Sequence, residues 1–163
     1  MKKGIQDKIC CKEFNPESWD GREHVWNEKL FVKDYVRQIF HIPLNMGAVL
    51  TRMTEKIESE DAKVKDEDFL ILAYDPSPWK SEIYINVSKE IRNMENVKLS
   101  GRYISKVYDG PYKDVPKWMD DFKKYLENQQ HKMVKFYLYY TTCPKCAKKY
   151  GHNYVVAIAQ IEN

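Results

Sequence analysis

Apolar and polar residues alternate in two separate parts of the chain, and each alternating segment stops near a proline. The first segment is YVRQIFHIPL at residues 35–44, and the second is LSGRYISKVY at residues 99–108. A period of two residues is typical of a strand with one buried face, and proline limits such a strand. Each segment therefore predicts a strand that opens a structural unit.

A helical period follows each of these strands. Asn45 and Asp114 are suited to begin the two helices, because their side chains can accept hydrogen bonds from free backbone amides. Apolar residues then recur at three- and four-residue spacing, which predicts one apolar stripe on each helix. The stripes are Met46, Val49, Leu50, Met53 and Ile57 in the first helix, and Val115, Trp118, Met119, Phe122, Tyr125 and Leu126 in the second.

Two more strands are predicted after each helix. In the first half they are FLILAY and EIYINV, joined by DPSPWKS, and in the second half they are VKFYLYY and YVVAIAQI. The order strand, helix, strand, strand thus occurs twice. We predict an α+β domain of duplicated strand-helix-strand-strand units with pseudo-twofold symmetry, antiparallel sheets and a central cleft.

The predicted domain covers residues 34–163, with repeat one at residues 34–90 and repeat two at residues 97–162. Residues 1–33 contain Trp19 and Trp26 but show no sustained periodicity. We expect them to form an irregular N-terminal leader packed on the domain, since they are too few for a domain of their own.

Composition and charge narrow the function classes. The net charge is +3 without a long basic run, so we expect no nucleic-acid partner. The first residues, MKKGIQDKICCKEF, lack the apolar stretch of an export signal, and no segment is long enough to span a membrane. We therefore expect a cytoplasmic protein with reduced cysteines and no membrane association. Twelve tyrosines suit a binding cavity and an aromatic core equally.

The segment YISKVYDGPYKDVPKWMDDFKKYL at residues 103–126 resembles the strand, Gly-Pro-Tyr turn and helix that open the second repeat of GyrI-like small-molecule-binding domains. IFHIPLNMGAVLTRM, at residues 39–53, occupies the matching place in the first repeat. The resemblance covers about residues 34–162 and implies an aromatic-lined cavity between the halves. The 33 leading residues cannot hold the DNA-binding helices of the family's transcription regulators. The expected protein is therefore a stand-alone member.

Relatives in that family include a gyrase inhibitor, effector domains of multidrug-responsive activators, and proteins that hydrolyse cyclopropane-bearing alkylating natural products. The resemblance places the pocket acid of the multidrug binders on a Glu-aliphatic-Tyr strand, which Glu82 matches in SEIYINV, with Tyr84 and Asn86 on the same face. These three residues could equally be the solvated face of a half-buried strand. Tyr137 and Tyr139 share another strand face, which we expect to line the cavity.

Four more aromatic residues complete the predicted ligand-binding set: Trp79, Tyr108, Tyr112 and Trp118. Trp118 also lies on the apolar helix stripe, where core packing is an alternative. The main prediction is a domain that binds aromatic or cationic small molecules without any required cofactor. A hydrolase for strained electrophiles, with Glu82 as base and Tyr137 as proton donor, is the second hypothesis. A protein-interaction module such as a gyrase modulator is the third.

The motif Cys143-Pro-Lys-Cys146 lies between the last two predicted strands. It could be a redox dithiol, half of a zinc site, or a turn with reduced cysteines that bind nothing. The redox hypothesis is disfavoured because such motifs normally open a helix, which lowers the thiol pKa. Cys10 and Cys11 could complete a structural zinc site with Cys143 and Cys146.

Overall fold

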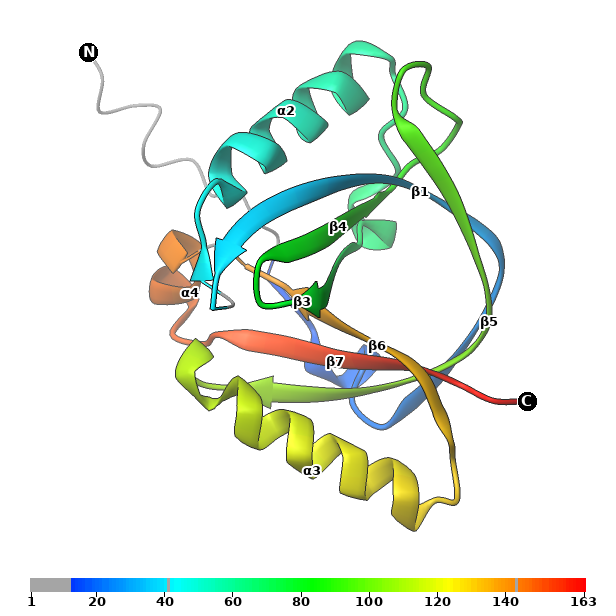
Figure 1. Cartoon of the computed structure of the whole chain (residues 1–163), viewed down its shortest axis with the longest axis vertical. Coiled ribbons are helices and arrows are strands. Elements are labelled where there is room, and N and C mark those ends of the chain that lie inside the picture. The colour runs from blue at the N-terminus through cyan, green and yellow to red at the C-terminus, as the bar shows by residue number, and fades with distance from the viewer. Residues whose placement is uncertain (1–12, 41, 143) are drawn as a thin grey trace.

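The computed structural model describes residues 13–40, 42–142 and 144–163. Helices are interspersed among groups of strands along this part of the chain (Figure 1). The strands are β1 Arg22–Ile39, β2 Ile42–Pro43, β3 Ile71–Ser77, β4 Lys80–Asn86, β5 Glu95–Asp109, β6 Met133–Tyr140 and β7 Tyr154–Ile161. The helices are α2 Met46–Ser59, α3 Val115–Asn128 and α4 Pro144–Tyr150, with short 3₁₀ turns at Pro16–Ser18, Asp66–Asp68 and Tyr112–Asp114. The fold is therefore of the mixed α+β class.

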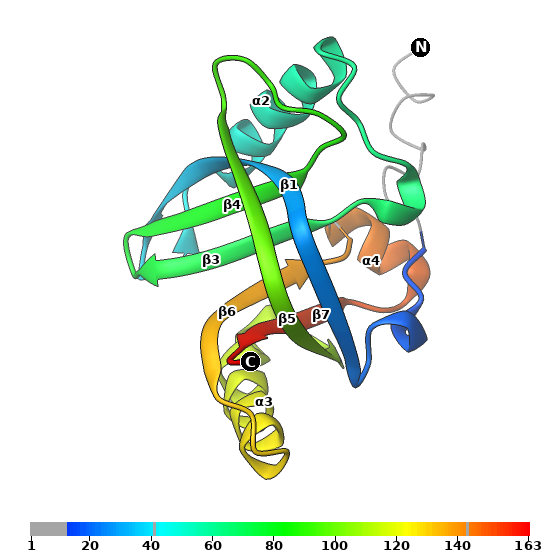
Figure 2. The ribbon, with the colours of Figure 1, turned by 90° about the vertical axis from the view of Figure 1, so that its right-hand side faces the viewer.

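All strand pairings are antiparallel, and they close on themselves. The order β2-β1-β4-β3-β6-β7-β5 is completed by a second pairing of β1, with β5. β1 and β5 are the two longest strands, and they run side by side across the others (Figure 2). Six strands thus enclose an interior, while β2 lies outside the closed ring as an edge strand.

The two long helices lie on opposite sides of the strands (Figure 1). The buried stripe of α2 packs on β1, β3 and β4 through Val49, Met53 and Ile57. The stripe of α3 packs on β5, β6 and β7 through Phe122 and Leu126. Each helix therefore covers the outer face of three strands, as its single apolar stripe predicted. The order strand, helix, strand, strand occurs in both halves, whereas an internal duplication with a twofold axis stays a prediction.

The predicted boundary at residue 33 is wrong, because residues 22–33 belong to β1 and not to an irregular leader. The register between β1 and β5 shifts between Trp26 and Lys29, and Glu28 has a φ of 50°. A bulge of this kind adds one residue to the strand, so the alternation of apolar and polar positions changes phase there. The strand then lacks the sustained two-residue period by which it could be predicted. Phe14 and Trp19, both in the predicted leader, are partly buried and pack against the interior.

Two connections also differ from the prediction. The first alternating segment does not run on to Pro43, because the chain turns after Ile39 and β2 pairs back onto β1. Phe40 makes this turn with a φ of 47°. The connection between β6 and β7 is no simple turn, since it contains α4. Asn45 and Asp114 do precede the helices, although the side chain of Asn45 accepts a hydrogen bond from the amide of Arg37, outside the helix.

No helix within the described residues is long and apolar enough to cross a membrane.

His24 provides a test of how the segment before β1 is held. Its Nε2 lies 2.8 Å from Ser105 Oγ, and its ring lies 4.6 Å from that of Trp19. Burial, with a smaller contribution from the nearby Lys29, lowers the pKa of His24 below 6.5. The unfolded chain therefore binds this proton more readily, so stability is lost as the pH falls through and below 6.5. We expect the melting temperature to fall by a few degrees between pH 7.5 and 5.5.

The matched control is His24→Gln, which removes the titrating group. The pH dependence of its melting temperature over the same range should be smaller than in the parent. An unchanged dependence in this variant would assign the effect to other groups.

Candidate functional site

Aromatic side chains fill much of the space inside the closed ring. We call Tyr74, Tyr84, Tyr103, Tyr137 and Tyr139 the tyrosine cluster; all but the partly buried Tyr74 are buried. The ring of Tyr84 meets that of Tyr137 edge-on, with 5.8 Å between centroids, and Tyr74 lies 5.9 Å from Tyr137. Period-two alternation explains the arrangement, because these residues point inward while their strand neighbours pack under the helices.

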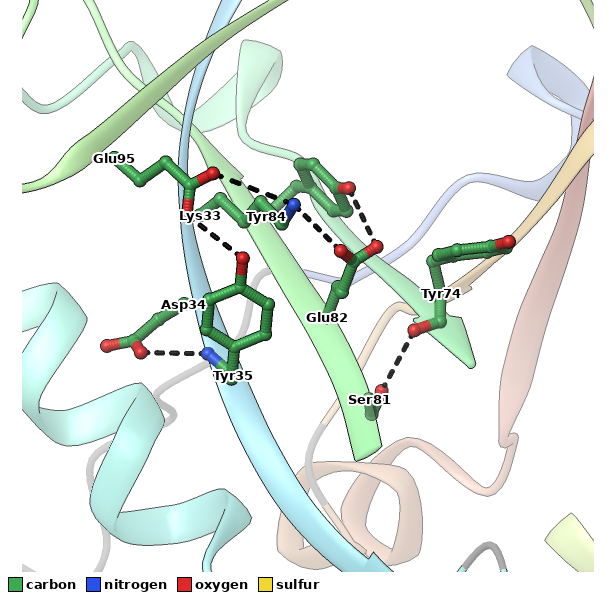
Figure 3. A network of polar contacts seen from close by, with 8 residues as sticks. All are labelled: Lys33, Asp34, Tyr35, Tyr74, Ser81, Glu82, Tyr84 and Glu95. Carbon is green, nitrogen blue, oxygen red and sulfur yellow. Dashed lines mark hydrogen bonds and ion pairs between the residues drawn. The ribbon is translucent and has the colours of Figure 1, made fainter. Parts of the chain in front are cut away.

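A group of charged and polar side chains borders the tyrosine cluster (Figure 3). We call Lys33, Glu82, Glu95, Tyr35 and the hydroxyl of Tyr84 the polar cluster. Its residues come from β1, β4 and β5, and the β1–β4 register sets Lys33 opposite Tyr84 and Tyr35 opposite Glu82. The charged side chains of Lys33 and Glu82 are only 15% and 13% exposed.

Both oxygens of Glu82 have partners. Lys33 Nζ lies 2.7 Å from Oε1, and the Tyr84 hydroxyl donates to Oε2 at 3.1 Å. On its other side Lys33 Nζ lies 3.7 Å from Glu95 Oε1, and the Tyr35 hydroxyl donates to Glu95 Oε2 at 3.1 Å (Figure 3). A carboxylate has about four lone-pair sites, so Glu82 keeps acceptor capacity for a water molecule.

These contacts hold Glu82 in its charged form. Burial by itself would raise the pKa of Glu82, but the hydrogen bonds from Lys33 and Tyr84 outweigh it and lower the pKa. Burial by itself would lower the pKa of Lys33, but its bonds to Glu82 and Tyr35 and the nearby Tyr84 and Glu82 together raise it. Burial and the adjacent Glu82 charge raise the pKa of Tyr84, so its hydroxyl stays protonated. At neutral pH the site therefore contains a carboxylate, an ammonium and a phenol.

Lys135 adds a second ammonium on the tyrosine side of Glu82. Its Nζ lies 4.1 Å from the ring centroid of Tyr74, 5.1 Å from that of Tyr137 and 5.6 Å from that of Tyr84. Burial lowers the pKa of Lys135; the nearby Glu82 opposes this shift, and Lys33 adds to it. Neither Lys33 nor Lys135 was among the predicted site residues, although Lys135 lies on the same strand face as Tyr137 and Tyr139.

Four of the predicted ligand-binding residues lie at the interior: Glu82, Tyr84, Tyr137 and Tyr139. Tyr84 donates a hydrogen bond to Glu82. Tyr137, the predicted proton donor, instead contacts the ring of Tyr84 with its own ring. The third residue on the Glu82 face, Asn86, has a structural role. Its side chain accepts from the amide of Leu70 and donates to the carbonyl of Asp68.

The other four aromatic candidates lie elsewhere. Tyr108 stacks on Trp118 at 5.5 Å and donates a hydrogen bond to Asp121, so this pair fills the contact between β5 and α3. Trp79 is 54% exposed in the β3–β4 turn, and Tyr112 is exposed beside Tyr140. Their predicted contact with a ligand alongside Glu82 does not fit these positions, because Tyr108 and Trp118 lie on the outer face of the strands under α3, and Trp79 and Tyr112 lie at the surface.

The structure also records a hollow of about 40 Å³ outside the tyrosine cluster. It lies beside the last turns of α2 and is lined by Thr54, Ile57, Glu58, Lys63, Val64, Phe69, Ile85 and Asn86. This volume suits a water molecule or two and not an aromatic ligand. An aromatic-lined cleft between the halves stays a prediction.

The four cysteines cannot be compared as a set, because Cys10, Cys11 and Cys143 lie outside the described residues. Cys146 is buried in α4. α4 begins at Pro144 and contains Cys146, so the expectation that this connection holds no helix, which disfavoured a redox dithiol, is wrong. Among the described residues no three His, Cys, Asp or Glu side chains are grouped as a metal would require.

Known structures share this fold. The crystal structure of a hydrolase encoded by lin2189 from Listeria innocua has a TM-score of 0.61 at 10% identity, over 99% of this chain and 97% of the other. The EcmrR C-terminal domain has a TM-score of 0.69 at 8% identity, over 89% and 98%. SAV2435, solved bound to tetraphenylphosphonium, has a TM-score of 0.53 at 13% identity, over 88% and 94%.

Identities this low establish a common fold and no shared activity. The neighbours, which include the ligand-bound SAV2435 and the EcmrR C-terminal domain, fit the GyrI-like fold that the sequence resemblance implied. No curated protein sequence gives a significant match. A family model described as "Bacterial hydrolase" matches residues 1–161, nearly the whole chain. The chain therefore belongs to the bacterial hydrolase family.

Proposed function

We propose that this protein is a hydrolase that detoxifies strained electrophiles, such as cyclopropane-bearing alkylating natural products, at the polar cluster. The observation that carries the proposal is the partly buried, ionised Glu82, bonded by Lys33 and Tyr84 at the border of the tyrosine cluster. Its carboxylate would accept a proton from water, while the tyrosine rings contact the aromatic part of the substrate. The family description and the fold shared with a Listeria hydrolase support this choice.

The reaction needs only water as co-reactant. In a cyclopropane conjugated to a carbonyl group, the water oxygen forms a bond to a ring carbon while the strained carbon–carbon bond breaks. The released electron pair moves to the carbonyl oxygen, which takes up a proton, and Glu82 accepts a proton from the attacking water. The product is the ring-opened alcohol.

A carboxylate with a lowered pKa is a weak base, which fits a reactive substrate better than an inert one. Release of ring strain supplies much of the driving force, so orientation of water can provide much of the acceleration. Lys33 and Tyr84 fix the orientation of the Glu82 carboxylate, and Tyr84 is a positioning residue in this scheme. Tyr137, the predicted proton donor, would contact the substrate through its ring.

The test is incubation with a cyclopropane-bearing alkylator, followed by chromatography and mass spectrometry. We expect the ring-opened product, heavier by one water, to form faster than in buffer alone. Saturable binding without any acceleration would instead favour the small-molecule-binding function. Neither binding nor turnover would reject both.

An exposed apolar patch favours a protein-interaction module as a second candidate. Phe40 is 71% exposed, and its ring lies 5.0 Å from that of Trp79. Ile39, Ile42 and Leu44 on and beside the β1–β2 hairpin are exposed as well. Apolar residues grouped at a surface often mark a contact with another molecule. A DNA-gyrase supercoiling assay tests the proposed gyrase contact, with inhibition expected from the parent and lost in Phe40→Ala.

Structural zinc at Cys10, Cys11, Cys143 and Cys146 remains a separate proposal, supported by the four thiols of the sequence. Metal analysis of protein purified without chelator should give one zinc per chain. A folded, metal-free sample would refute this site.

A further inference from the structure

The ammonium of Lys135 occupies a place where aromatic rings would otherwise receive an external cation. Its Nζ lies 4.1 Å from the centroid of Tyr74 and within 6 Å of two further rings, those of Tyr84 and Tyr137. The faces of aromatic rings attract cations at such distances. A cationic ligand would therefore have to displace the chain's own ammonium from these rings.

The carboxylate of the site has a cationic partner as well. Lys33 Nζ lies 2.7 Å from Glu82 Oε1. A tethered ammonium competes at an effective concentration in the millimolar range, far above that of a dilute free ligand. Glu82 is thus poorly placed to attract an external cation, even though it is the acid that the family resemblance singled out.

The local charge also favours ligands that carry negative charge. Two ammonium groups lie beside the tyrosine rings, those of Lys33 and Lys135, and both have Glu82 nearby. The second carboxylate near Lys33 is Glu95, whose side chain is 50% exposed, where water screens its charge.

We infer that Lys135 sets the charge selectivity of this site, which accepts an anionic group or the carbonyl oxygen of a neutral electrophile and excludes permanent cations. The inference rests on the proposed hydrolytic site and specifies its substrate class. During ring opening the carbonyl oxygen becomes negative, and a lysine ammonium in a partly desolvated position can donate a hydrogen bond to it. Stabilisation of this negative charge would account for the position of the Lys135 ammonium among tyrosine rings.

The experiment compares two ions of nearly equal size and opposite charge, tetraphenylborate and tetraphenylphosphonium. Binding of each ion is measured by equilibrium dialysis in sodium buffer. We expect the parent to bind the borate at least tenfold more tightly than the phosphonium. Lys135→Met should lower this preference at least tenfold, and Lys135→Arg, which keeps the charge, should retain it. Lys132→Met is the matched control, because Lys132 is exposed and paired with Glu162 at the end of β7.

Equal affinity of the parent for the two ions, or no binding of either, would overturn the inference. So would a preference that Lys135→Met leaves unchanged while circular dichroism shows the variant folded. The dialysis experiment measures binding and involves no turnover. The predicted charge selectivity can therefore be observed when no ring-opened product forms, and product can form when the selectivity is absent. The two proposals therefore fail separately.

Discussion

Glu82→Gln should reduce the turnover of a cyclopropane-bearing electrophile by about 100-fold or more, the usual contribution of a general base. The amide is close to isosteric with the carboxylate but cannot take a proton from water. Lys33 keeps Glu95 at 3.7 Å after the change, so we expect the variant to fold. Product formation under single-turnover conditions, with a thermal melt of the same sample, gives both quantities.

Two variants make this prediction specific. Glu95→Gln removes the other carboxylate near Lys33, but it leaves the Lys33–Glu82 pair intact, so turnover should change by less than about threefold. Glu82→Asp keeps the charge on a shorter side chain and should retain partial activity. Turnover by Glu82→Gln equal to that of the parent would remove Glu82 from the mechanism.

Phe122→Ala should lower the free energy of unfolding by about 3–5 kcal/mol, the range typical of a buried phenylalanine. Phe122 is fully buried, and its ring lies 5.8 Å from that of Phe136 on β6. The truncation would leave a cavity between α3 and the strands that it covers. Urea denaturation followed by circular dichroism measures the effect.

Phe40→Ala is the matched control because it deletes the same atoms from an exposed position. Phe40 contacts Trp79 at the surface, and alanine is no better suited than phenylalanine to its φ of 47°. We expect a change of less than about 0.5 kcal/mol. Equal losses of unfolding free energy in the two variants would contradict the assignment of the Phe122 side chain to the core.

The strands of the second half and its long helix α3 were predicted well, because each has a clear local hydrophobic pattern, whereas α4 was missed. The apolar run YVVAIAQI coincides with β7, and the stripe that contains Phe122 and Leu126 is the buried face of α3. The β-bulge after Trp26 removed that signal from β1, and the positive φ of Phe40 turned one predicted strand into a hairpin. A bulge or a left-handed residue changes the chain direction without an obvious change in hydrophobic pattern.

Only part of the candidate site was predicted from the sequence. Period-two alternation placed Glu82 beside Tyr84 on one face, and it placed Lys135 on the face of Tyr137, although that second signal was not used. The aromatic candidates Trp79 and Trp118 show the limit of residue type as a guide. The same ring suits a turn tip, a helix contact or a ligand, and only its surroundings distinguish these places.

The sequence by itself determined the class of the main elements after residue 34, the buried stripes of α2 and α3, and which residues share one face of a strand. These follow from backbone geometry, since the side-chain period of a strand or helix is local. Only the tertiary structure decided that β1 pairs with β4 and β5 together, which closes the ring and sets Lys33 beside Glu82. Pairing and register depend on contacts between distant residues, so the ion pair that defines the site has no local signature in the chain.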